Sequence, residues 1–95
     1  MIVEKTEIFE KWFLELKDDM ARKKINARIG RIESSGFFGD CEPVGDKVFE
    51  LRIHYGPGYR VYFYQEGDSI VLLLCGGDKG SQKKDIKKAK EMVKC

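Results

Sequence analysis

The sequence has 95 residues, which suits one compact domain spanning residues 1–95. Hydrophobic residues make up 42% of it, as in ordinary globular proteins, and the formal net charge is only +2. No apolar run approaches the roughly 20 residues of a membrane-spanning helix, and charges interrupt the first residues every few positions, which excludes a secretion signal. We therefore expect a cytoplasmic protein without a membrane partner.

Residues that bind metals or form disulfides are few. The cysteines Cys41, Cys75 and Cys95 are odd in number and lack a CxxC spacing, and the sequence has one histidine. This pattern indicates neither a disulfide framework nor a zinc site. We expect no metal and no cofactor.

The first third of the chain predicts a short strand, IVEKT, and two helices. The apolar stripe of the first helix is Phe9, Trp12, Phe13 and Leu16. The stripe of the second is Ala21, Ile25, Ile29 and Ile32. The first stripe has the helical spacing i, i+3, i+4, i+7, and the second has steps of four, four and three residues, so each lies on one face of a helix. Asp18 or Asp19 can cap the second helix and Gly36 can end it, so the short link predicts an antiparallel helix hairpin.

The remaining residues predict a loop, three strands and a last helix. FFGDCEPVGDK has the Gly, Pro and Asp punctuation of a loop. VFELRIHY, YRVYFYQE and SIVLLLC follow as strands, and SQKKDIKKAKEMVKC as a basic helix. The predicted order is β-α-α-β-β-β-α, an α+β fold in which the helix hairpin packs on an antiparallel sheet.

The segment HYGPGYRVYFY predicts a hairpin with a three-residue loop, Gly56-Pro57-Gly58. This loop would pair Leu51 with Phe63, Ile53 with Val61, Arg52 with Tyr62, and His54 with Arg60. A following two-residue turn at Gly67-Asp68 would place Phe63 opposite Leu72 and Val61 opposite Leu74. The face against the helices would then consist of Phe49, Leu51, Ile53, Val61, Phe63, Leu72 and Leu74.

The opposite face of the predicted sheet is polar. It would carry Arg52, His54, Arg60, Tyr62 and Tyr64. Clustered cations repel each other unless an anion compensates them, and tyrosines can stack on nucleic-acid bases. The pattern favours nucleic-acid binding, but Glu50 could offset the charge and make the face purely structural.

The C-terminal segment is strongly basic. Residues 79–95 hold seven lysines against Asp85 and Glu91, a local charge of +5. This segment is a candidate surface for a nucleic acid or an acidic protein, although it could also be a solvated helix face. The glycine-rich turn before it could offer backbone N–H groups to an anion beside Lys79 and Lys83. Simple capping by Ser81 is the alternative.

Two motifs together carry a resemblance to a known family. ELRIHYGPGYRVYF, followed by LLLCGGDKGSQKKDIKKAKE, closely resembles the addiction-module killer proteins, and so does F-x-x-W-F-x-x-L in the first helix. These are HigB-like toxins of the RelE/ParE superfamily, from type II toxin–antitoxin systems. The resemblance covers nearly the whole chain. It implies an endoribonuclease that cleaves mRNA on the ribosome and inhibits translation. It also implies a co-expressed helix-turn-helix antitoxin that forms a hetero-oligomer with the toxin.

The resemblance also suggests roles for individual residues. The candidate catalytic residues are Arg52, His54, Arg60, Tyr62 and Lys79. The candidate RNA-binding residues are Tyr55, Tyr64, Lys83, Lys84 and Lys87. His54 would transfer the proton, because the ordinary pKa of histidine is near neutrality. Tyr62 would stack on the nucleic-acid base, or would replace His54 as the proton carrier. Unlike several active relatives, this sequence has no tyrosine after position 64. A ParE-like inhibitor of DNA gyrase and a non-catalytic binding module remain alternatives.

Overall fold

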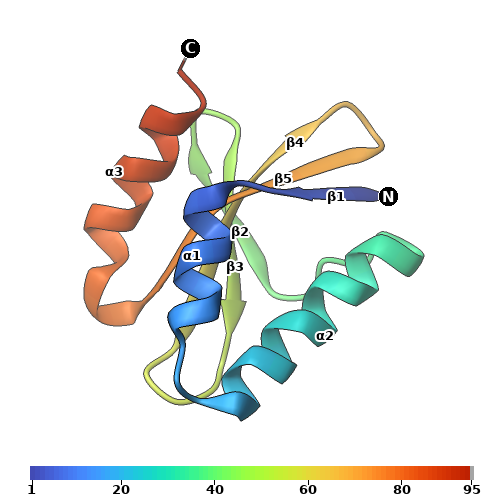
Figure 1. Ribbon diagram of the computed structural model, residues 1–95. Helices are drawn as coiled ribbons and strands as arrows, with labels where there is room; N and C mark the ends of the chain where they lie inside the picture. Colours follow the sequence, from blue (N-terminus) through green and yellow to red (C-terminus); the bar gives the residue numbers. More distant parts are fainter. Residues whose placement is uncertain (95) are drawn as a thin grey trace.

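The fold is a five-stranded sheet with α1 and α2 on one face and α3 on the other (Figure 1). The computed structural model describes residues 1–94. In chain order the elements are β1 (Ile2–Lys5), α1 (Glu7–Glu15), α2 (Asp19–Ser35), β2 (Cys41–Gly45), β3 (Val48–Ile53), β4 (Tyr59–Glu66), β5 (Ile70–Asp78), a 3-10 turn (Lys79–Ser81) and α3 (Gln82–Met92). The sheet order is β1-β5-β4-β3-β2, with only β1 and β5 parallel among the described residues. The α+β prediction is confirmed. No helix within residues 1–94 could cross a membrane.

The two N-terminal helices begin and end where local signals place them. The Thr6 side chain accepts a hydrogen bond from the Phe9 N–H at 3.0 Å and caps α1. Asp18 caps α2 by accepting from two N–H groups of its first turn. Gly36 ends α2 in the left-handed conformation, with φ 70°. The predicted helix hairpin is confirmed.

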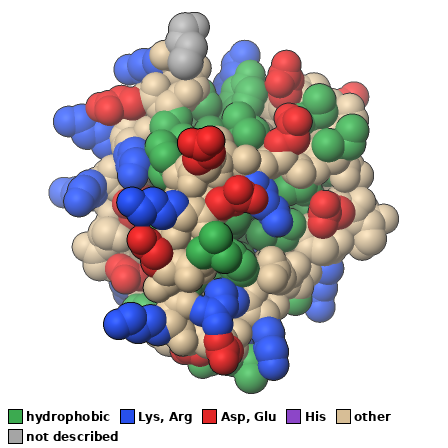
Figure 2. Space-filling view, in the orientation of Figure 1, with side chains coloured by type: hydrophobic (Ala, Val, Ile, Leu, Met, Phe, Trp, Pro, Cys, Tyr) green, Lys and Arg blue, Asp and Glu red, His purple; other side chains and the backbone are tan. Residues whose placement is uncertain are grey.

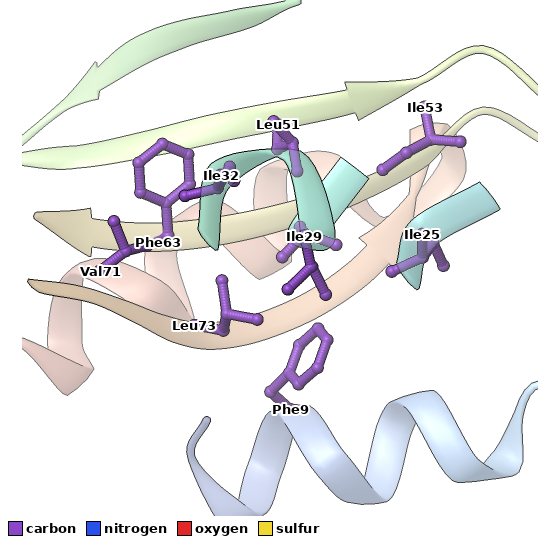
Figure 3. Close-up of a cluster of buried hydrophobic side chains, with 10 residues drawn as sticks. Phe9, Ile25, Ile29, Ile32, Leu51, Ile53, Phe63, Val71 and Leu73 are labelled. Carbon is purple, nitrogen blue, oxygen red and sulfur yellow. The ribbon is translucent and has the colours of Figure 1, made fainter. Parts of the chain in front are cut away.

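The main hydrophobic core lies between this hairpin and the sheet (Figure 3). Its buried members are Phe9, Ile25, Ile29, Ile32, Leu51, Ile53, Val61, Phe63, Val71 and Leu73. The partly buried Trp12, Phe13, Leu16 and Phe49 pack against them. The predicted core is therefore correct on the helices, β3 and β4. It is wrong on β5, where Val71 and Leu73 replace the expected Leu72 and Leu74.

The predicted loop before β3 contains an additional strand. β2 pairs with β3 as an antiparallel edge strand, and the turn between them is Asp46-Lys47. Both turn residues have positive φ, 55° and 64°, as a two-residue type I′ turn requires. Asp-Lys is not a usual sequence for this turn, so local signals did not reveal the strand. Pro43 is accommodated because β2 lies at the sheet edge.

The β3–β4 register differs from the prediction by two residues. Leu51 pairs with Val61, and Arg52 pairs with Arg60 rather than Tyr62. The cause is a five-residue loop, residues 54–58, in place of the expected three-residue loop. Because side chains alternate with period two, each residue of both strands keeps its predicted face.

The β4–β5 register differs by one residue, which has a larger effect. Glu66 pairs with Ile70, so the turn has three residues instead of two, and Phe63 pairs with Leu73. A one-residue shift exchanges the two faces of a strand. The strand also has a bulge, since Tyr62 pairs with Cys75 and leaves Leu74 as the extra residue.

α3 covers much of the sheet face that was predicted to be polar. A second buried cluster joins Val48, Tyr62, Leu74, Cys75 and Ala89. Ile86, Met92 and Val93 pack against it from α3 and the residue that follows. The polar face is therefore exposed only near the β3–β4 loop and the edge of the sheet.

Candidate nucleic-acid interface

The β3–β4 loop forms one wall of an open cavity of about 430 Å³. Its lining residues are His54, Tyr55, Gly56, Pro57, Gly58, Arg60 and Lys79. Gly56 and Gly58 have φ of 57° and 80°, which glycine adopts without strain. A Cβ atom at Gly58 would lie 2.9 Å from the Arg60 guanidinium, so glycine also leaves room for that group. The loop thus brings three of the predicted catalytic residues, His54, Arg60 and Lys79, to one cavity.

Arg60 is held firmly beside the cavity. Its Nη1 donates a hydrogen bond to the Gly58 carbonyl at 2.6 Å, and its Nε lies 3.7 Å from Glu50 Oε2. The side chain is 11% exposed, and its buried Nε has no hydrogen-bond partner among residues 1–94. A guanidinium fixed by the protein can meet a developing negative charge without reorganisation.

A buried carboxylate organises this region. We call Glu50, Arg52, Arg60, Tyr62 and Gln82 the Glu50 network. Glu50 is 1% exposed and accepts hydrogen bonds from Arg52 Nε at 3.0 Å, the Tyr62 hydroxyl at 3.0 Å and Gln82 Nε2 at 2.8 Å. Burial alone would raise the pKa of Glu50, but these hydrogen bonds and the Arg60 charge outweigh it and lower that pKa. Glu50 therefore stays ionised and offsets part of the arginine charge.

Tyr62 does not lie in the open site. It is 0% exposed, packs under α3 and donates its hydroxyl to Glu50. Burial, followed by the hydrogen bond to Glu50, raises its pKa above the ordinary tyrosine value. The prediction that Tyr62 stacks on a base or carries a proton is wrong, because α3 covers it.

His54 is exposed and interacts with Asp40 rather than lying opposite Arg60 in the sheet. Its Nε2 forms a hydrogen bond with the Asp40 carboxylate. The hydrogen bond to His54 is the main cause that lowers the pKa of Asp40. Because a carboxylate accepts, Nε2 is the donor and Nδ1 is the other ring nitrogen available to a ligand.

The backbone N–H groups of the glycine-rich turn before α3 already donate hydrogen bonds within the protein. The Asp78 side chain accepts from the N–H groups of Gly80 at 2.8 Å and Ser81 at 3.2 Å. Ser81 itself makes no capping bond to α3 and donates its hydroxyl to Asp85 at 2.5 Å. The predicted anion site on these backbone groups is therefore wrong. Ser81 does occupy the N-cap position of α3, as the alternative proposed, but its side chain does not make the capping bond.

The tyrosines predicted to bind RNA have other contacts. Tyr55 lines the cavity, but its hydroxyl donates to Asp18 at 3.0 Å and the Lys24 ammonium lies 5.3 Å from its ring centroid. Tyr64 is half-buried near the other end of β4, where it packs on the α3 cluster. The structure does not bring Tyr64 to the loop cavity.

The α3 lysines form a separate basic surface. Lys83, Lys84 and Lys87 are all exposed. Figure 2 shows Lys and Arg side chains gathered on the side of the molecule where α3 runs. Lys84 lines a different cavity, of about 530 Å³, between α1 and α3. These lysines lie outside the loop cavity and could contact only a ligand that extends beyond it.

Two contributors to the site were not recognised in the sequence. Asp40 contacts His54 from 14 residues away, and Gln82 contacts Glu50 from 32 residues away. No local pattern links these pairs. The sequence did show that Glu50 and Arg52, two residues apart, share one face of β3. This spacing correctly indicated that Glu50 compensates part of the arginine charge.

Comparison with known proteins places this chain in a family. Residues 11–94 match the model of the phage-derived protein Gp49-like family (DUF891). The chain belongs to the Gp49-like family. An uncharacterized protein of Haemophilus influenzae strain Rd is 51% identical to this Gp49-like chain over 88 residues, which are 93% of the chain and 88% of the relative.

Solved structures show that this Gp49-like protein has the RelE fold. A double mutant of the E. coli toxin RelE in the free state matches with a TM-score of 0.77 at 13% identity, covering 97% of this chain and 96% of RelE. The RelB-RelE antitoxin-toxin complex from Methanococcus jannaschii matches with 0.70 at 15% identity, covering 86% and 96%. The intact E. coli RelBE toxin-antitoxin complex matches with 0.67 at 14% identity, covering 81% and 94%.

Proposed function

We propose that this protein is the toxin of a type II toxin–antitoxin system, HigB-like, and that it inhibits translation by cleaving mRNA on the ribosome. The observation that carries the proposal is the convergence of Arg60, Lys79 and His54 on one open cavity of a RelE fold. Two cations and a proton-transfer group are what metal-independent RNA cleavage needs.

The proposed reaction is an attack of a nucleotide 2′-OH on its own 3′ phosphate. The P–O5′ bond breaks, giving a 2′,3′-cyclic phosphate and a 5′-OH. Arg60 and Lys79 stabilise the extra negative charge of the phosphorane. Arg52 is hydrogen-bonded to Glu50, as well as lying near Glu42, so we assign it the role of positioning Arg60 through Glu50.

His54 moves the proton in this proposal. Asp40 accepts from Nε2 and orients the ring, so Nδ1 is the atom that takes the 2′-OH proton. Tyr55 supports the loop through Asp18, and any contact of its ring with RNA is secondary. Tyr64, Lys83, Lys84 and Lys87 would contact the ribosome or more distant RNA.

A cognate antitoxin is the proposed protein partner. Two of the similar RelE structures are complexes with the antitoxin RelB. The resemblance of the sequence to HigB-like toxins suggests a helix-turn-helix antitoxin. We propose that it forms a hetero-oligomer with this chain and covers the cationic cavity.

The decisive experiment is cleavage of ribosome-bound mRNA by purified protein, with product ends mapped. Replacing the exposed Lys79 with alanine cannot unpack the core, and it should lower the rate ~10²-fold or more. Arg60→Ala should lose ~10²–10³-fold, with Arg60→Lys recovering part of it. Lys5→Ala, at an exposed position on β1, is the matched control and should cleave normally.

Three results would contradict the proposal. Products with a 5′ phosphate would rule out the 2′-OH mechanism. Intact mRNA together with arrested DNA replication would indicate gyrase inhibition, and RNA binding without cleavage would indicate a binding module. Growth arrest that disappears when the neighbouring antitoxin gene is co-expressed would support the proposed pairing.

A further inference from the structure

A second cationic groove adjoins the loop cavity. It has a volume of about 240 Å³, and we call it the α2 groove. Its lining residues are Lys24, Ala27, Arg28, Arg31, Ile53 and His54. The four α2 residues follow the spacing i, i+3, i+4, i+7, so they share one face of the helix. His54 lines both hollows, so the two are neighbours on the surface.

Arg28 gives this groove a fixed positive centre. Its Nη1 donates to the Arg52 carbonyl at 2.5 Å, and its Nη2 donates to the carbonyls of Phe38 at 2.7 Å and Asp40 at 3.1 Å. Gly39 has φ 73°, and a Cβ atom there would lie 2.9 Å from the Arg28 guanidinium. The glycine therefore permits the close approach that holds the guanidinium in place.

The groove carries an uncompensated positive charge. None of the ion pairs found among residues 1–94 includes Lys24, Arg28 or Arg31. Asp40 is the acidic residue whose charge acts on Arg28, and its carboxylate is already bound by His54. Three cations therefore face one carboxylate, and the balance attracts an anion.

We propose that the α2 groove is a second phosphate-binding subsite, which holds the RNA backbone next to the nucleotide in the loop cavity. The inference rests on the proposed function. Lys24 and Arg31 are seven residues apart, about 10 Å along the helix axis, so a strand that follows this face meets both cations. Neighbouring cationic hollows, one of them lined by the partly exposed Tyr55 ring, combine the charge and aromatic surface that single-strand binding uses, which favours RNA over an acidic protein.

The test is the salt dependence of RNA binding. Affinity for a single-stranded RNA with 2′-O-methyl riboses, which cannot be cleaved, is measured by fluorescence anisotropy between 50 and 200 mM salt. Each lost phosphate contact should reduce the slope of log K against log salt by about 0.7. Lys24→Ala with Arg31→Ala should therefore reduce it by about 1.4. The wild type then loses about sevenfold more affinity than the double variant over this range.

A charge-matched control separates the groove from general electrostatics. Lys23 neighbours Lys24 in sequence but lines a different hollow, beside Asp19 and Asn26. Lys17→Ala with Lys23→Ala removes the same charge from exposed positions and should leave the slope at its wild-type value. Equal slopes for both double variants, or no change in either, would overturn the inference.

The other outcomes are also informative. Wild-type protein that cleaves mRNA on the ribosome but does not bind the oligonucleotide at 50 mM salt would overturn the subsite and leave the proposed function intact. A Lys24/Arg31 variant that binds RNA normally but no longer binds the antitoxin would show a protein interface instead. Wild-type protein that neither cleaves mRNA nor binds the oligonucleotide would overturn both proposals.

Discussion

The Glu50 network and the α2 groove use arginine in opposite ways. In both, a guanidinium donates to backbone carbonyls, Arg60 to Gly58 and Arg28 to Arg52. The network adds a carboxylate that is 1% exposed, and the groove has no acidic partner of this kind among the described residues. The same side chain is therefore compensated in one region and left with its charge available in the other.

The pKa values reflect this difference. The hydrogen bond to Glu50 is the main cause that raises the pKa of Arg52. Burial lowers the pKa of Arg28, and the Asp40 charge does not fully offset that effect. A compensated cation contributes to folding and precise placement, whereas an uncompensated one exerts an outward field that a ligand can neutralise. The following predictions test this distinction.

The largest expected effect is on the Glu50 network. Glu50→Gln removes the charge that balances Arg52 and Arg60 and should lower the free energy of unfolding by about 3 kcal/mol. Denaturant unfolding measures this change. Glu42→Gln is the control, because Glu42 is 58% exposed and 3.6 Å from Arg52, and it should change stability by less than about 1 kcal/mol.

The stabilities of the wild type and of Glu50→Gln should also depend differently on pH. The pKa of Glu50 is lower in the folded state than in the unfolded state, so its contribution is complete above the unfolded value of about 4.3. It is lost as the pH falls through the lower folded pKa. The stability difference between wild type and Glu50→Gln should therefore be constant above about pH 5 and shrink below about pH 4. A constant difference at all pH values would contradict this.

A smaller effect is expected at the network's tyrosine. Tyr62→Phe removes one hydrogen bond to a charged acceptor and should cost about 1.5–3 kcal/mol. Because Tyr62 is buried away from the cavity, cleavage per folded molecule should be unchanged. Thermal melts and a cleavage assay below the melting temperature measure both quantities. A large loss of cleavage activity in fully folded Tyr62→Phe protein would show that Tyr62 does take part in catalysis.

The backbone support of the α2 groove is the next test. Gly39→Ala should cost about 1–2 kcal/mol, because φ 73° strains alanine and the new methyl group displaces Arg28. RNA affinity should fall as well, since the fixed cation moves. Gly67→Ala is the matched control, with φ 61° and nothing within 4 Å, so it should cost stability without changing RNA binding.

The smallest effect on stability is expected at the groove's exposed cation. Arg31→Ala removes a side chain with no ion pair in residues 1–94, and it should change the free energy of unfolding by less than about 0.5 kcal/mol. Urea titrations should therefore show the smallest loss of unfolding free energy for this variant and the largest for Glu50→Gln. A loss above 2 kcal/mol for Arg31→Ala would show that the groove is structural.

The sequence by itself determined the parts of this protein that depend on neighbouring residues. The stripes of α1 and α2, the caps at Asp18 and Gly36, and the α+β order were predicted because helical period and capping are local properties. The faces of β3 and β4 were also correct, although the register was wrong by two residues, since an even shift keeps the alternation. This is why Arg60 was recognised as part of a cationic site.

Only the tertiary structure decided which of the polar residues are open to a ligand. One extra turn residue reversed the expected face of β5 as far as the bulge at Leu74. α3 then covered Tyr62, and Asp40 and Gln82 arrived from distant segments to pair with His54 and Glu50. The physical reason is that register, burial and charge pairing depend on turn length and on contacts between residues far apart in the chain, which no local pattern encodes.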